Sequence, residues 1–458
     1  MRRVIIFIFF VWVSFQSNAE NLPNTLSQEQ KLFGLSKIWS EAKYNDAFFD
    51  NIGEEKWDSA YRAFMRPVIN TPNDYEYFRE LARFCALLRD GHSYVYYRKS
   101  THITTLFDTF QWYLSCIEGK AIVTGISSKQ KDLVPVGSEI VEVNGMPTAE
   151  YLDRYVIPYI SSSTDYIRMD VAVSRMFRSL RGDSYHVKIV TPSGKTKEMS
   201  ITHDLVQAVM DDPMFPEQKK WKLVDLKWYP GDVAYIALNS FADPKIVKEF
   251  EAVFSELKRA KKLIVDLRDN GGGNTNNGVA ILKYLTPDNH IVGSGWQTRV
   301  HNPAYMSWGR GYTPGDTVNN GFAAKVYLSY RRKYYEYNEP HIVHISSDQE
   351  RLVVPTVLLV GHGTASAAED FLIYADQQKH MTKIGQRSNG STGNPIMFEL
   401  EGDGMFAICS KKDTYPDGRE FVGYGVKPDM EVIPTVKDLI NGYDRALEEA
   451  FKFLKKAK

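Results

Sequence analysis

Short apolar runs and helical patterns alternate along the second half of the chain, and this alternation limits the possible folds. Three runs are apolar and rich in β-branched side chains, which is typical of strands buried on both faces. We expect strands at residues 233–238, 263–267 and 357–360, and helices over residues 246–259, from Asn276 and from Ala367. Because strands that alternate with helices usually pair in parallel, the pattern predicts an α/β core around a parallel sheet.

The chain is long enough for several domains. Its 458 residues predict about three, at ~150 residues each. We place an N-terminal helical domain at residues 20–100, a β-rich domain with a helical insertion at residues 101–205, and the α/β core at residues 206–458. The 56 basic and 56 acidic side chains balance, which argues against a nucleic-acid binder. Three scattered cysteines are too few for a disulfide framework or a zinc cluster.

Local signals place elements in the first two domains. Ser27 and the glutamine three residues later form a capping box that opens a helix. A second helical pattern covers residues 78–88, and Gly91 suits the C′ position after it. In the second domain, residues 140–145 read as a strand closed by an Asn-Gly turn, and residues 150–181 read as helical.

The N-terminus has the three parts of a secretory signal peptide. Two arginines precede an apolar run at residues 4–15, and Ser17 and Ala19 are the small residues that a signal peptidase reads. The run is shorter than the ~20 apolar residues that span a bilayer. We therefore expect residues 1–19 to be removed. The mature protein would be periplasmic or extracellular and would not span a membrane.

Three consecutive glycines directly follow one of the buried strands, in residues 266–273 (DLRDNGGG). Glycine has no Cβ, so backbone N–H groups in such a loop approach a ligand closely. The loop could cradle a phosphate or an oxyanion. The chain has no Walker lysine and no spaced G-x-G-x-x-G beside it, which disfavours nucleotide binding. Taken alone, the motif is equally compatible with a tight structural turn.

A second motif, residues 360–369 (VGHGTASAAE), leads from the end of a buried strand into a helix. Ser366 is expected at the N-terminus of that helix, where free N–H groups and the helix dipole favour developing negative charge. An acyl-transfer nucleophile needs this environment. In isolation, the residues also suit a serine that only caps the helix. Glu369 and Asp370 follow it, and compensation of the helix dipole is their expected role.

Together, the two motifs resemble those of the C-terminal processing (tail-specific) serine peptidase family, which includes the tricorn core. Further matches to the family follow along the chain, at residues 88–93, 137–145, 231–236, 385–386, 417–419 and 425–429. The resemblance implies a crotonase-like (ClpP-type) spiral α/β core, a PDZ-like β domain and an N-terminal helical region.

The resemblance also assigns roles to individual residues. Ser366 falls on the nucleophile of the family. The Ala367 N–H and a glycine N–H fall on the oxyanion hole of the family. The glycine is Gly271 or Gly272, and the alignment favours Gly272.

The general base is where this chain departs from part of the family. The bacterial tail-specific branch has a lysine about 25 residues after the serine, and Ser391 stands there instead. The tricorn branch uses an N-terminal histidine, which His92 matches. That branch has a serine before its histidine, where this chain has Gly91, and a glutamate in its closing strand, where this chain has Val422. Glu420 lies two residues earlier and is a candidate to orient the base or bind substrate.

Three points stay open at this stage. His362 is a rival base four residues before Ser366, although we expect its ring to bond backbone atoms. A non-catalytic peptide- or small-ligand-binding protein on the same fold is the competing class, because the family includes retinoid-binding modules. The segment 312–336, rich in tyrosine and basic residues, either gates the site or packs against the core.

The resemblance implies an exported serine endopeptidase that cleaves polypeptides through an acyl-enzyme on Ser366. Its PDZ-like domain would hold the C-terminal tail of the substrate by adding a strand to its edge. No cofactor, metal or nucleic acid is expected to take part.

Overall fold

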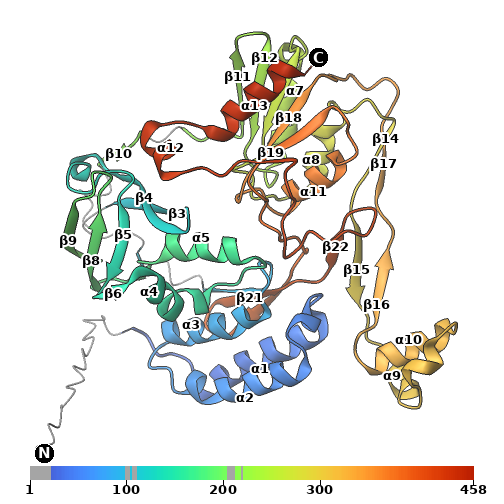
Figure 1. Ribbon diagram of the computed structural model, residues 1–458. Helices are drawn as coiled ribbons and strands as arrows, with labels where there is room; N and C mark the ends of the chain where they lie inside the picture. Colours follow the sequence, from blue (N-terminus) through green and yellow to red (C-terminus); the bar gives the residue numbers. More distant parts are fainter. Residues whose placement is uncertain (1–21, 98–103, 106–110, 204–211, 218–219, 458) are drawn as a thin grey trace, which may run out of the picture.

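The computed structural model describes residues 22–97, 104–105, 111–203, 212–217 and 220–457. The expected signal peptide, residues 1–19, lies outside the described residues. Within the described ranges, no helix has the length and apolar character needed to cross a membrane. Figure 1 shows an α/β layer at the top, a β-rich region at the left and a group of helices at the bottom.

A six-stranded sheet forms the α/β layer, in the order β11-β12-β13-β18-β19-β23. All neighbours pair in parallel except β11, which runs antiparallel to β12 at one edge. The parallel α/β core expected from the sequence is thereby confirmed. The strands are β11 (Val224–Tyr229), β12 (Val233–Leu238), β13 (Lys262–Asp266), β18 (Thr356–Val360), β19 (Met381–Gly385) and β23 (Met430–Glu431).

Helices cover both faces of this sheet because alternate strand residues point to opposite sides. Ile236, Val265 and Leu358 belong to the large apolar cluster on one face. Ile264 and Leu359 belong to a second cluster on the other face. Three helices pack on the first face: α7 (Lys245–Leu257), α8 (Thr275–Leu282) and α11 (Ala367–Ala375). The C-terminal helix α13 (Arg445–Lys456) packs on the second face and follows the short helix α12 (Val436–Asn441).

The β-rich region is a second, separate sheet with the order β10-β4-β5-β8-β9, to which β3 and β6 are added. Asn144 and Gly145 both have positive φ, 53° and 74°, so the Asn-Gly turn is confirmed. Its strands are β3 (Trp112–Ile117), β4 (Lys120–Ser127), β5 (Glu139–Val143), β6 (Met146–Pro147), β8 (Ser184–Val190), β9 (Thr196–Thr202) and β10 (Met214–Phe215).

The helical insertion expected in this region is present, but it is broken into pieces. The longest piece, α5 (Asp165–Arg175), lies beside the β-rich strands in Figure 1, below the α/β layer and above α3 (Asp74–Cys85). The other elements are η4 (Ser128–Gln130), α4 (Thr148–Tyr155), η5 (Ile157–Tyr159) and a short pair of strands, β2 (Thr104–Thr105) and β7 (Ser179–Leu180).

The first N-terminal helix begins as the sequence predicts. Ser27 and Gln30 form both hydrogen bonds of the capping box at the start of α1. The elements are α1 (Gln28–Asn45), η1 (Phe49–Asn51), α2 (Glu54–Ile69), α3 (Asp74–Cys85) and η2 (Ala86–Leu88).

These helices share their apolar core with strands from far along the chain. Leu81 and Phe84 lie in one buried cluster with Phe406 and Ile408. The strand β1 (Tyr94–Tyr97) pairs with β21 (Gly404–Ile408), which also pairs with β20 (Ile396–Leu400). The range 20–100 therefore packs onto part of the C-terminal range, and the three-way division of the chain stays a prediction.

The expected C′ role of Gly91 is wrong. The left-handed residue after the helical segment is Arg89, with φ +55°. Gly91 has another reason to lack a side chain, because a Cβ there would lie 2.6 Å from the Ser391 Oγ. Its small size thus lets the loop at residue 391 approach the loop that carries His92.

A long excursion leaves the α/β layer between α8 and β18. Figure 1 shows it at the right, with two short helices at its far end. It contains β14 (His290–Val292), β15 (Gly295–Arg299), α9 (Pro303–Gly309), η6 (Pro314–Thr317), α10 (Gly321–Tyr330), β16 (Tyr335–Asn338) and β17 (Ile342–His344), and β15 also pairs with β22 (Lys412–Thr414).

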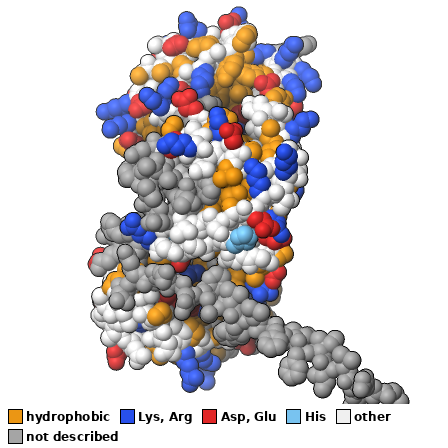
Figure 2. Space-filling view, turned by 90° about the vertical axis from the view of Figure 1, so that its left-hand side faces the viewer, with side chains coloured by type: hydrophobic (Ala, Val, Ile, Leu, Met, Phe, Trp, Pro, Cys, Tyr) orange, Lys and Arg blue, Asp and Glu red, His pale blue; other side chains and the backbone are white. Residues whose placement is uncertain are grey.

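Charged side chains of both signs are scattered over the described surface of the face seen in Figure 2. This agrees with the zero net charge of the chain.

Candidate active site

The turn between β18 and α11 holds Ser366 in an unusual backbone conformation. Its φ is +54° and its ψ is −121°, a region that costs a non-glycine residue on the order of 1–3 kcal/mol and is concentrated at functional sites. Neighbouring loops hold the turn in place. The Ala365 N–H donates to the Asn270 carbonyl at 3.0 Å, and the Ser366 N–H lies 3.2 Å from the Ser391 carbonyl. The two sequence motifs therefore meet at this turn.

The glycine loop packs directly beneath Ser366. A Cβ on Gly272 would lie 2.8 Å from the Ser366 Cβ and 2.9 Å from the Ala367 nitrogen. The Gly272 N–H donates to the Asn270 Oδ1 at 2.9 Å, while the Asn270 Nδ2 donates to the Leu238 carbonyl at 2.8 Å. The buried Asn270 thus fixes the loop, a role that the sequence did not reveal.

The two candidate glycine donors differ in this arrangement. The Gly272 N–H is engaged by Asn270, whereas Gly271 is exposed. Ala367 is the first residue of α11, so its N–H belongs to the first helical turn, where N–H groups have no partner within the helix. These contacts make the Gly271 N–H a better candidate than the Gly272 N–H for the second oxyanion-hole donor beside Ala367.

We expect Gly272→Ala to destabilise the protein and Gly271→Ala to leave it nearly unchanged. Gly272 has φ +96°, and its new Cβ would meet the Ala365 carbonyl oxygen at 2.6 Å, whereas a Cβ on Gly271 would meet nothing within 4 Å. A strained φ with a backbone clash should cost roughly 2–4 kcal/mol of unfolding free energy. Urea unfolding of both variants measures the difference. Equal stability of the two would contradict this account of the loop.

Glu369 has a larger structural role than compensation of the helix dipole. Its side chain is fully buried and accepts hydrogen bonds from the Ser366 N–H at 3.0 Å and the Ser391 N–H at 3.1 Å. It also accepts from the Gly390 N–H at 2.7 Å and the Ser388 Oγ at 2.5 Å. One carboxylate therefore ties the Ser366 turn to the loop at residues 388–391. Burial raises the pKa of Glu369 to about 7, against the opposing effect of these hydrogen bonds.

The raised pKa of Glu369 predicts a pH-dependent stability. The folded state holds the proton more tightly than the unfolded state, whose ordinary pKa is 4.5. The associated stability is fully present below pH 4.5 and is lost as the pH rises through about 7. The loss should be roughly 3 kcal/mol at 1.4 kcal/mol per pKa unit.

Urea unfolding at several pH values tests this expectation. Glu369→Gln should lack this component of the pH dependence, because glutamine does not titrate. The matched control is Glu55→Gln, at an exposed position of α2, which should keep the wild-type dependence. Parallel pH dependences for Glu369→Gln and the wild type would contradict the assignment.

His92 lies in the loop between η2 and β1, and its ring contacts the loop at residue 391. The His92 Nδ1 is 2.7 Å from the Ser391 Oγ, and the His92 N–H donates to the Asp90 Oδ2 at 3.1 Å. Ser391 stands where part of the family has a lysine. It contacts both the candidate base and the candidate nucleophile: its hydroxyl contacts His92, and its carbonyl accepts from the Ser366 N–H.

Burial lowers the pKa of His92, while the charges of Asp90 and Asp413 oppose this and Lys411 adds to it. The imidazole is therefore favoured in its neutral form at neutral pH, which is the form that accepts a proton. Lys411 and the buried Asp413 form an ion pair at 2.8 Å, and the Thr392 Oγ1 donates to the other oxygen of Asp413 at 2.7 Å. No motif marked this pair in the sequence, because it reaches the site only through the fold.

The other expected participants have different contacts. Glu420 is exposed and forms an ion pair with Lys412 at 2.5 Å. Val422 is buried in the main apolar cluster. The sequence predicts that the His362 ring bonds backbone atoms. Its Nδ1 instead contacts the Oδ2 of Asp170, in α5, at 2.5 Å. The helix from the β-rich region therefore contacts the Ser366 turn directly.

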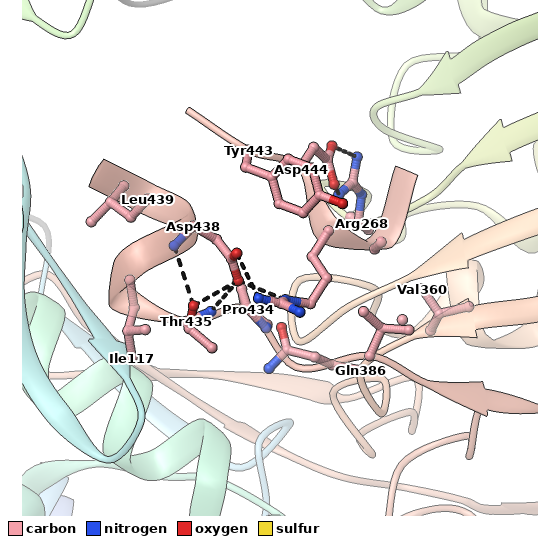
Figure 3. A pocket seen from close by; sticks show the side chains of 14 residues that line it. Ile117, Arg268, Val360, Gln386, Pro434, Thr435, Asp438, Leu439, Tyr443 and Asp444 are labelled. Atoms are coloured by element: carbon pink, nitrogen blue, oxygen red, sulfur yellow. Dashed lines mark hydrogen bonds and ion pairs between the residues drawn. The ribbon is translucent and has the colours of Figure 1, made fainter. Parts of the chain in front are cut away.

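A cavity of about 260 Å³ lies next to this turn, at the carboxyl ends of β13, β18 and β19 (Figure 3). Its lining includes Val360 and Gln386 but not Ser366. Arg268 borders it and binds both oxygens of Asp444 at 2.8 Å, and it also contacts Asp266 at 2.6 Å. These ion pairs tie the start of the glycine loop to the segment before α13.

Comparisons with known proteins agree with this fold. Residues 232–432 match the model of peptidase family S41. The chain is 22% identical over 428 residues to the carboxyl-terminal-processing protease of Synechocystis sp., an alignment that covers 90% of this chain and 83% of that protein.

Two solved structures also resemble the chain. Mature CPAF complexed with lactacystin matches with a TM-score of 0.68 at 15% identity, over 93% of this chain and 98% of that one. A crystal structure of a putative peptidase from Parabacteroides merdae matches with a TM-score of 0.50 at 17% identity, over 94% of this chain and 97% of that one. At these identities the two structures support the fold alone.

The α/β fold and the matches define this chain as a peptidase homologue. Residues 232–432 carry the match to peptidase family S41, and 90% of the chain aligns with a homologous carboxyl-terminal-processing protease. The family resemblance found in the sequence is confirmed at this level.

Proposed function

We propose that the protein is an exported serine peptidase in which Ser366 is the nucleophile and His92 is the general base. One observation carries the proposal: Ser391 bonds the His92 ring through its hydroxyl and the Ser366 N–H through its carbonyl. His92 and Ser366, which are far apart in the sequence, thus both contact Ser391. The positive φ of Ser366 at a helix N-terminus adds support, because such strain is typical of functional turns.

The proposed mechanism is acyl transfer. The His92 Nδ1 contacts Ser391, so we assign the Nε2 to the proton of the Ser366 hydroxyl. As that proton moves to His92, the Ser366 Oγ attacks a peptide carbonyl, and the imidazolium then protonates the leaving amine. Water hydrolyses the resulting acyl-enzyme.

We assign the oxyanion hole to the Ala367 N–H and a glycine N–H, Gly271 in preference to Gly272. Each donor of this kind is worth about 3–4 kcal/mol of transition-state stabilisation. The location of Ala367 at the start of α11 supports its role, since the helix dipole favours negative charge there.

We further assign the core to the crotonase-like spiral fold and the β-rich region to a PDZ-like domain. This domain would bind the C-terminal tail of a polypeptide by adding a strand to its edge. The hydrogen bond between the His362 Nδ1 and the Asp170 Oδ2, and the 2.6 Å hydrogen bond from the Tyr166 hydroxyl to the Ser388 carbonyl, connect α5 with the candidate site. Tail binding would thus occur on a domain that touches the catalytic loops.

Covalent trapping tests the proposal directly. A fluorophosphonate probe reacts with an activated serine, and we expect mass spectrometry of the mature protein to find one adduct, on Ser366. The Ser366→Ala variant should remain unlabelled. Absence of an adduct, combined with no cleavage of unstructured polypeptides, would favour a non-catalytic binding protein on this fold.

A further inference from the structure

The two-helix tip of the long excursion stands away from the remainder of the molecule. We call residues 303–334, which contain α9 and α10, the hairpin. Figure 1 shows it at the lower right, beyond the ends of β15 and β16. Its helices pack closely on each other, because Gly309 lies against the backbone of Val326, and Ala323 and Val326 are fully buried between them. The hairpin is therefore a compact unit that is attached mainly through its two strands.

Large apolar side chains are exposed on this unit. Trp308, Phe322 and Val318 are 54%, 52% and 70% exposed. The Trp308 and Phe322 rings lie 6.2 Å apart, and each also contacts the ring of Tyr305. The exposed rings thus form one aromatic cluster rather than isolated surface residues. An exposed cluster of this kind is typical of a binding surface.

The hairpin is also strongly basic, although the whole chain is neutral. It contains five basic residues and one acidic residue, a net charge of +4. Arg332 is engaged in an ion pair with Glu54 at 3.1 Å. Arg310, Arg331 and Lys333 are exposed. Positive charge and apolar rings therefore occur together on one projecting unit.

We propose that the hairpin binds the anionic surface of a lipid bilayer. Trp308 and Phe322 enter the interfacial region, where aromatic rings are favoured, and Arg310, Arg331 and Lys333 face the negatively charged headgroups. A second copy of the chain is a less suitable partner, because a two-fold interface would bring two hairpins of charge +4 together. The proposal goes beyond peptide cleavage and is independent of the assigned catalytic residues.

Vesicle sedimentation tests the proposal with the mature full-length protein. We expect binding to vesicles that contain phosphatidylglycerol to be at least ~tenfold tighter than binding to vesicles of phosphatidylcholine alone. Each basic side chain near an anionic surface should contribute roughly fivefold, so Arg310→Gln, Arg331→Gln and Lys333→Gln together should weaken binding on the order of a hundredfold. Trp308→Ala with Phe322→Ala should also weaken it.

Matched variants elsewhere on the surface separate this effect from general charge and hydrophobicity. Lys56, Lys248 and Lys455 are exposed on α2, α7 and α13, and their combined change to glutamine should leave vesicle binding unchanged. Trp221→Ala, at a 68% exposed position outside the hairpin, is the aromatic control.

Three results would overturn the proposal. These are equal binding to both kinds of vesicle, undiminished binding by the hairpin variants, or loss of self-association by Trp308→Ala with Phe322→Ala in a protein that binds no vesicles. The last result would identify the hairpin as a protein–protein interface. Urea unfolding of every variant shows whether a loss of binding reflects misfolding.

Discussion

Replacement of Ser366 by alanine is expected to lower kcat/KM for an unstructured polypeptide by at least ~10⁴-fold. The change removes the only atom that can form the proposed acyl-enzyme. It leaves two backbone hydrogen bonds of the turn in place, because the Glu369 carboxylate and the Ser391 carbonyl accept from the backbone N–H of residue 366. The variant should therefore remain folded and continue to bind substrate.

Steady-state cleavage of a fluorogenic polypeptide measures this effect. Ser193→Ala, in the exposed turn between β8 and β9, is a matched serine control that should keep full activity. Cleavage by Ser366→Ala at the wild-type rate would reject the nucleophile. A residual activity that a second purification step removes would indicate a contaminating peptidase instead.

The second large effect concerns His92. We expect His92→Ala to lower kcat by roughly 10²–10⁴-fold, the usual contribution of a general base. Since burial lowers the pKa of His92, the wild-type kcat/KM should be retained at neutral pH. It should fall only as the pH drops through a value below 6.5, where the imidazole becomes protonated.

The variants around His92 separate a base from a positioning residue. Ser391→Ala removes the 2.7 Å contact with the His92 Nδ1 and should reduce kcat less than His92→Ala does. It should also shift the acid limb of the pH profile, because the environment of the imidazole changes. His362→Ala is the control histidine. If His362→Ala, and not His92→Ala, removed activity and the acid limb, His92 would not be the base.

Much of the fold could be predicted from local sequence. The alternation of β12, α7, β13 and α8 follows from short apolar runs between amphipathic helices, because a strand buried on both faces needs apolar residues throughout. The capping box at Ser27 and the turn at Asn144 were equally readable, since each depends on residues within a few positions. Gly91 was misread because local rules suggested a helix end, whereas its real constraint is Ser391, 300 residues away.

Some features of the candidate site were likewise readable from local sequence, and others depended on the tertiary fold. The sequence by itself determined the two motifs around Gly272 and Ser366 and their place at strand ends, because both are local strand-to-loop patterns. Only the tertiary structure brought His92 to Ser391, engaged the Gly272 N–H with Asn270, and paired His362 with Asp170. It also showed that Glu369 is buried beneath the site and not exposed at a helix end. Contacts of this kind join side chains that are distant in the sequence, and their geometry depends on how whole layers pack, which no local pattern encodes.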